Sequence, residues 1–141
     1  MKPNLIIVII LCAALLCGCA TIYRPGITQR AELFTSAALA MVSPPSRQAE
    51  YAAAAIRLSE ALYNIEATAL QSPAALQAWL EKTLNVQDSA LRQWLIRLAV
   101  NQLTPVIRCI QNGEKFERAL ETIHAISKGI ELGARPFTNH P

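Results

Sequence analysis

The sequence predicts an all-α protein, a small bundle of four to five helices packed mainly antiparallel. Strand-like alternation of apolar and polar residues is absent, whereas apolar residues recur at steps of three and four between breaks rich in proline, serine and glycine. Glycine is scarce, with 5 residues in 141, and alanine is abundant. The breaks are short, about two to five residues, and such connections favour antiparallel neighbours.

The first helix is predicted at about residues 28–42. Its apolar face is predicted to consist of Leu33, Ala37, Ala40 and Met41, with Phe34 and Ala38 beside it. Two prolines follow at positions 44 and 45 and cannot continue the helix, whereas Ser46 can cap the next one.

The second helix is predicted at about residues 47–71, because an apolar stripe recurs at three- and four-residue steps from Tyr51 to Ala69. The third helix is predicted at about residues 73–84. Ser72 can cap its amino end, and proline is favoured at the first helical position.

The fourth helix is the most apolar segment after the N-terminus and is predicted to end at about Gln111. Either Asn85 or Asp88 caps its amino end, and Asn112-Gly113 stops it. Pro105 is expected to kink this helix or to end it near Thr104, since proline lacks the amide hydrogen of a helical residue.

The last helix is predicted at about residues 114–132, with Gly133 as its stop. Residues 134–141 are then a flexible tail. With these bounds, the bundle domain covers residues 28–133.

The N-terminus has the layout of a secretory signal peptide. Lys2 supplies one positive charge, an unbroken apolar run extends from Leu5 to Leu16, and small residues follow. Twelve residues rise about 18 Å as a helix, whereas the hydrocarbon core of a bilayer is about 30 Å thick. A stable spanning helix is therefore not expected here.

The apolar run ends in Leu16-Cys17-Gly18-Cys19. This stretch resembles the bacterial lipobox, in which an aliphatic residue and two small residues precede a cysteine. The resemblance implies a diacylglycerol thioether on Cys19 and cleavage between Gly18 and Cys19. Residues 1–18 would then be removed, and residues 19–27 would be the lipidated N-terminus and a short linker. An ordinary secreted signal or an uncleaved anchor is the alternative.

The residue after the modified cysteine is Ala20 and not aspartate. In bacteria with two membranes, this resembles the pattern of lipoproteins sent to the outer membrane, facing the periplasm. If Cys19 carries lipid, Cys109 has no second cysteine with which to form a disulfide. Because Cys109 lies on an apolar helix, we expect it to be a buried thiol.

The charge balance and the residue inventory argue against nucleic-acid binding and catalysis. Only Lys2 is charged among residues 1–18, so 12 basic and 10 acidic residues remain, a net charge of about +2. There is no phosphate loop, Gly-x-Ser-x-Gly stretch or zinc-ligand run. Neither a Cys109–His124 nucleophile nor a Glu121–His124 metal site is favoured. No enzymatic activity, metal or cofactor is predicted, apart from the covalent lipid.

The favoured function is that of a tethered lipoprotein which binds or assembles another envelope protein. It resembles pilotins, but only in size and lipidation. The candidate contact residues are Trp79 and Trp94, which lie in the similar stretches 75–80 and 90–95, and the polar edge formed by Arg97, Asn101 and Arg108. Core packing of the tryptophans and a solvated edge are the structural alternatives.

Two other functions stay open at this point. A small molecule or lipid could bind in a cavity between the helices. A phage or plasmid lipoprotein acting in lysis or exclusion would have the same sequence features. The oligomeric state and the identity of the partner do not follow from the sequence.

Overall fold

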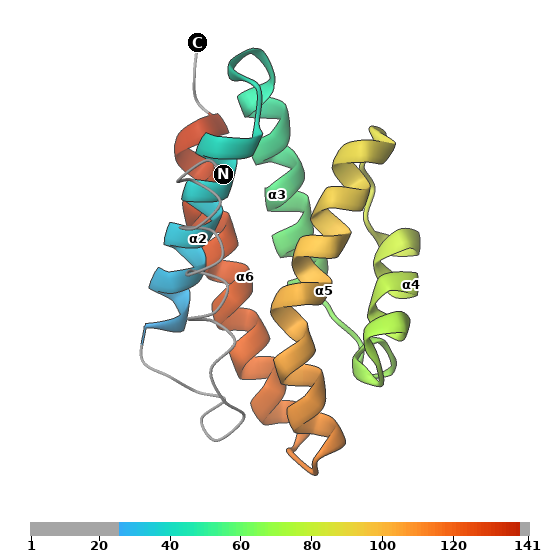
Figure 1. The fold of residues 1–141 in the computed structure, drawn as a ribbon. Coiled ribbons are helices and arrows are strands. Elements are labelled where there is room, and N and C mark those ends of the chain that lie inside the picture. Colours follow the sequence, from blue (N-terminus) through green and yellow to red (C-terminus); the bar gives the residue numbers. More distant parts are fainter. Residues whose placement is uncertain (1–25, 139–141) are drawn as a thin grey trace, which may run out of the picture.

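The computed structural model describes residues 26–138, which form five α-helices and two short 3₁₀ helices (Figure 1). No strand occurs among these residues, and the all-α prediction is confirmed. The predicted signal peptide, the lipidation site and residues 139–141 lie outside the described residues. The elements are α2 Ile27–Val42, η1 Pro45–Arg47, α3 Gln48–Tyr63, η2 Ala67–Leu70, α4 Pro73–Thr83, α5 Ser89–Gln111 and α6 Phe116–Thr138.

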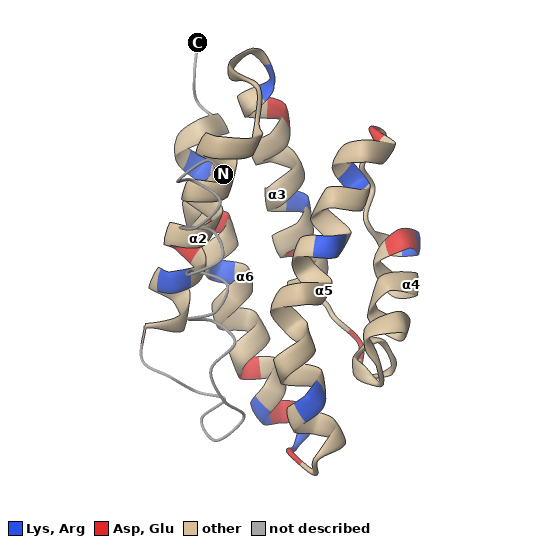
Figure 2. Ribbon diagram, viewed as in Figure 1, with Lys and Arg blue, Asp and Glu red and all other residues tan. Residues whose placement is uncertain are grey.

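The helices pack mostly antiparallel, as predicted (Figure 1). α6 lies against both α2 and α3, and α4 packs on α5 and η2 at the opposite edge of the molecule. The largest fully buried side chains come from every helix and from η2, and a single cluster of buried apolar residues includes members of all five helices. Figure 2 shows basic and acidic residues interspersed along the helices.

α2 and α6 depart from the antiparallel packing, because they run in the same direction, as α3 and α5 also do. Gly129 lies against Thr28 and Ala31, and one turn further along α6, Gly133 lies against Glu32 and Thr35. A Cβ atom added at either glycine would overlap backbone atoms of α2. The two helices therefore approach each other as closely as glycine alone permits.

The predicted helix end at Gly133 is wrong. α6 continues through Gly133 and Pro136 to Thr138, and Ala134 is fully buried, so residues 134–138 belong to the helix and not to a tail. Glycine often ends a helix by adopting a positive φ angle, but among the described residues only Gly26 and Gly113 do so. Gly133 serves close helix packing instead.

α3 ends at Tyr63, eight residues before the predicted end at Gln71. Asn64 closes the helix, and its side-chain amide donates to the Glu60 carbonyl oxygen at 2.9 Å. The chain then turns into η2, yet Ile65 and Ala69 remain buried. The apolar stripe looked continuous because these residues enter the same core from a different element.

The predicted apolar face of α2 is wrong as well. Leu33 is 64% exposed and Ala40 is exposed, whereas the buried positions of the helix are Ala31, Phe34, Thr35, Ala38 and Leu39. No charged residue occurs between Glu32 and Arg47, so apolar or small side chains lie on every side of this helix. Contact with the two glycines of α6 decides which side faces inward.

Ser46 does not cap α3 as predicted, because it lies within η1, and Arg47 holds the N-cap position without a side-chain cap. Three other helix ends follow the capping signals. Ser72 Oγ accepts a hydrogen bond from the Ala75 amide at 3.0 Å, and Asp88, not Asn85, caps α5 by accepting from the Leu91 amide at 3.1 Å. At the end of α5, Gly113 has φ +101° and the Glu114 amide donates to the Cys109 carbonyl oxygen at 2.9 Å. α5 does not end near Thr104 but continues through Pro105.

Candidate functional site

The residues predicted to contact a partner all lie on α4 and α5. Arg97, Asn101 and Arg108 are exposed on α5, where their spacing places them along one edge of the helix. Trp79 and Trp94 are half-buried and pack against the core, and the Trp94 ring lies 6.3 Å from the ring of Tyr51 on α3. The tryptophans thus fill the edge of the core, and the polar edge faces solvent.

A cluster around Arg47 joins the start of α3 to the start of α5. Its guanidinium donates to both carboxylate oxygens of Glu50 at 2.8 Å and to Asp88 Oδ2 at 2.6 Å. The same group lies 5.4 Å from the centre of the Tyr51 ring. We call Arg47, Glu50, Tyr51 and Asp88 the Arg47 cluster. It holds together two helix ends that are about 40 residues apart in sequence.

Hydrogen bonds within the Arg47 cluster shift the ionisation of its members. The bonds from Arg47 are the main reason why the pKa values of Glu50 and Asp88 lie below their ordinary range, and the Leu91 amide lowers the pKa of Asp88 further. The bonds to Glu50 and then to Asp88 raise the pKa of Arg47. All three groups are therefore charged at neutral pH.

These shifts predict a loss of stability in acid. Carboxylates with a lowered pKa in the folded state stabilise the protein above their unfolded pKa, about 4, and this stabilisation is lost as the pH falls through the lower folded values. We expect the Tm of the wild type to fall between about pH 5 and pH 2, and that of an Arg47→Gln variant to fall less. Thermal unfolding followed by circular dichroism at a series of pH values checks this.

An Arg118→Gln variant is the control for this measurement, because Arg118 is exposed and its nearest approach to Glu114 is 3.8 Å. It should keep the pH dependence of the wild type. Parallel curves for the wild type and Arg47→Gln would contradict a stabilising role of the cluster.

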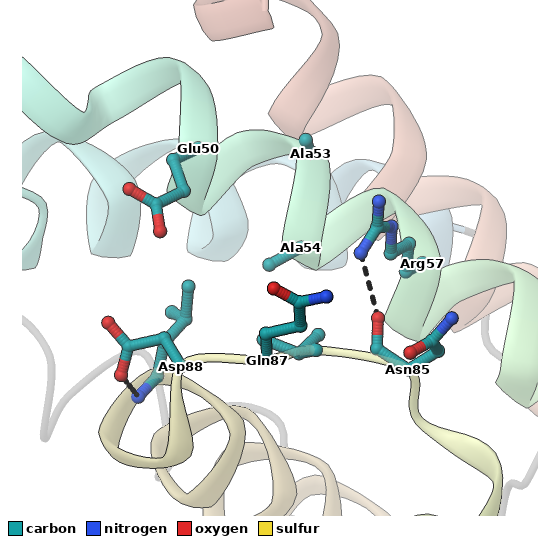
Figure 3. A pocket seen from close by; sticks show the side chains of 9 residues that line it. Glu50, Ala53, Ala54, Arg57, Asn85, Gln87 and Asp88 are labelled. Carbon is teal, nitrogen blue, oxygen red and sulfur yellow. Dashed lines mark hydrogen bonds between the residues drawn. The ribbon is translucent and has the colours of Figure 1, made fainter.

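A hollow of about 370 Å³ lies between α3 and the loop that precedes α5 (Figure 3). The apolar part of its lining consists of Ala53 and Ala54 of α3 together with Val86 and Leu91. Glu50 and Asp88 lie at one end, and Arg57 lies at the other, where its Nη1 donates to the Asn85 carbonyl oxygen at 2.8 Å. Gln87 lies between the two ends.

A second hollow, of about 390 Å³, adjoins the first and shares Arg57 and Asn85 with it. It extends along α3 past Glu60 to Asn64 and is bounded on the other side by Thr83. We call the two hollows together the α3 groove. Its lining residues extend from Glu50 to Asn64, and the hydrogen bond between Arg57 and Asn85 lies where the two hollows adjoin.

The residues of the α3 groove were not predicted as a site from the sequence. Glu50 and Arg57 are seven positions apart, which places them on one face of a helix, two turns from each other. That spacing was a usable signal, and Arg57 does lie off the apolar stripe of the second helix. The opposite wall of the groove comes from a loop whose position no local pattern predicts.

Cys109 and His124, the other residues with reactive side chains, each have a place in the packing of the fold. Cys109 is buried, as expected. His124 contacts Tyr63 on α3, where its Nε2 donates to the backbone carbonyl at 2.9 Å and its ring stacks on the tyrosine ring at 4.3 Å. Within residues 26–138, no group of three or more histidine, cysteine, aspartate or glutamate side chains is placed to hold a metal ion.

Comparison with known proteins yields no match, whether with family models, with curated proteins or with solved structures. Among the described helices, none combines the length and the apolar character needed to cross a bilayer. The function is therefore inferred from the residues and the geometry of this chain.

Proposed function

We propose that this protein is a lipid-anchored lipoprotein of the cell envelope that binds or assembles another envelope protein and has no enzymatic activity. One observation carries the proposal: the apolar run from Leu5 to Leu16 ends in Leu16-Cys17-Gly18-Cys19. This arrangement resembles a lipobox, and Ala20 after it favours the outer membrane, on the side facing the periplasm.

The distance from the anchor to the bundle supports a role at the membrane surface. Gly26, the residue before α2, is seven positions after Cys19. Seven extended residues reach at most about 25 Å, so the amino end of α2 stays within that distance of the lipid. Such a tether raises the effective concentration of the domain beside other proteins of the same membrane.

The polar groups of the bundle support binding in preference to catalysis. Arg47, Glu50 and Asp88 pair with one another, and His124 is engaged with the Tyr63 backbone. The exposed edge of Arg97, Asn101 and Arg108 and the α3 groove are candidate surfaces for a partner.

A Cys19→Ser variant tests the anchor. We expect it to lose membrane attachment and labelling by palmitate, because serine has no thiol to form the thioether, while the helical domain stays folded. Fractionation of cells grown with labelled palmitate checks both, and circular dichroism checks the fold. Cys17→Ser is the matched control, since it changes a cysteine two residues away and should remain lipidated. Palmitate labelling of the Cys19→Ser protein would contradict the proposed lipid anchor.

Crosslinking in intact envelopes tests the second half of the proposal. An affinity pulldown of the lipidated protein should yield one dominant envelope protein, and the Cys19→Ser protein should not. Recovery of the same protein at the same yield without the anchor would show that the tether is not needed for the interaction.

A further inference from the structure

α2 has an outer side without charge. Leu33, Ala37 and Ala40 follow one another at steps of four and three, on the side of the helix that faces away from α6. Leu33 and Ala40 are exposed, and Ala37 is half-buried. No charged residue occurs between Glu32 and Arg47, so nothing on this side requires bulk water. We call Leu33, Ala37 and Ala40 the α2 outer face.

The chain enters the bundle at its flank and not at its tip. Gly129 of α6 lies against Thr28, next to the start of α2. The part of α6 that precedes this contact begins at Phe116, so it extends beyond the start of α2 by thirteen positions, or about 20 Å (Figure 1). This tip of the bundle exposes the charged residues Lys115, Glu117 and Arg118.

The length of the linker decides which side of the bundle lies next to the membrane. Cys19 and Gly26 are seven positions apart, and seven extended residues reach at most about 25 Å. A bundle standing on its charged tip would hold the start of α2 about 20 Å above the surface and stretch the linker almost to its limit. A bundle lying on α2 needs no such extension.

We infer that the α2 outer face rests on the phospholipid bilayer that holds the Cys19 lipid, so that the bundle lies on its side at the membrane surface. The inference rests on the proposed function and adds an orientation to it. Leu33 lies at the boundary between headgroups and acyl chains. Arg30, exposed one turn earlier on the same side, pairs with lipid phosphates. α4, at the opposite edge of the molecule, faces away from the membrane and toward a partner (Figure 1).

Spin labels test this orientation in the lipidated protein. The protein is purified from the envelope and reconstituted into vesicles of phosphatidylethanolamine and phosphatidylglycerol, with a nitroxide on Leu33→Cys or, as the positional control, on Asn101→Cys of α5. Cys109 is buried, so the introduced thiol takes the label. Oxygen concentrates in hydrocarbon, whereas a water-soluble nickel chelate does not. The ratio of their collision rates should be roughly threefold or more higher at position 33 than at position 101.

A charge on the α2 outer face should remove the contact. Ala40→Glu places a carboxylate against the anionic headgroups of phosphatidylglycerol and should lower the ratio at position 33 to that at position 101. Ala90→Glu, the same change at an exposed alanine of α5, should leave the ratio at position 33 unchanged. Circular dichroism checks that both variants stay folded.

Three results would overturn the inference. Free access of both reagents to position 33 would place α2 in water, and low collision rates for both would place protein over it, such as a second copy of the chain. The third is a ratio that Ala40→Glu does not lower. All three leave the proposed function standing if the protein floats with the vesicles in a density gradient. Protein that does not float contradicts the lipid anchor, and the proposed function and this inference then fail together.

Discussion

Gly129→Leu is expected to destabilise the fold by at least about 3 kcal/mol, a large fraction of the roughly 5–15 kcal/mol that holds a domain folded. The first atom of any side chain at this position overlaps the Thr28 carbonyl oxygen and Ala31 Cβ. The obstacle is largely backbone, which cannot rotate away as the end of a flexible side chain can. α2 must therefore separate from α6. Urea unfolding followed by circular dichroism measures the loss.

Glu121→Leu is the matched control, because it introduces the same side chain at an exposed position of the same helix. Its stability should change by less than about 0.5 kcal/mol. Equal stability of the Gly129→Leu and Glu121→Leu proteins would mean that α2 does not pack on α6 as closely as the structure has it.

Phe34→Ala is expected to cost about 3–5 kcal/mol, because Phe34 is only 2% exposed and its removal leaves a cavity in the space that the ring fills. For a domain of this size, the Tm should fall by roughly 10 °C or more. Differential scanning calorimetry of the purified protein gives the shift directly.

The adjacent residue supplies the comparison. Leu33 is 64% exposed, so Leu33→Ala should change the free energy of unfolding by no more than about 0.5 kcal/mol. The two substitutions together test which side of α2 faces the core. A larger loss of stability from Leu33→Ala than from Phe34→Ala would instead support the face of α2 that was predicted from the sequence.

The helix ends were predictable where the signal is local. Ser72, Asp88 and Gly113 each act through hydrogen bonds or a backbone angle within a few positions of themselves, so their residue types indicate an end, although Asn85 was an equal candidate for the cap that Asp88 forms. The end of α3 at Tyr63 has no comparable glycine or proline, and the apolar stripe continues past it. The end of this helix is seen only in the three-dimensional structure.

The two glycines of α6 show why residue type alone can mislead. Gly133 follows a periodic helix and has the position expected of a stop, but it faces Glu32 and Thr35, about 100 residues earlier in the chain. The four-residue spacing of Gly129 and Gly133 was visible in the sequence, and it marks one face of a helix. What it could not show is which helix lies opposite.

The candidate site was predictable only in part. The exposure of Arg97, Asn101 and Arg108 follows from their common place on an otherwise apolar helix, and the structure confirms it. The α3 groove was not found, since it requires Glu50 and Arg57 on one helix to meet Asp88 from the end of a distant loop. Lipidation of Cys19 stays a prediction.

The pairing of α2 with α6 also sets an order of assembly for the chain. Ala31 and Gly129 are 98 positions apart, and closing so large a loop is entropically costly until nearly the whole polypeptide is present. Among the described helices, the earliest, α2, must therefore wait for the last, α6, before its Ala31 face is covered. A chain that terminates before α6 would lack the helix that packs on both α2 and α3. Nonsense mutations late in the gene should be as damaging as those in its middle.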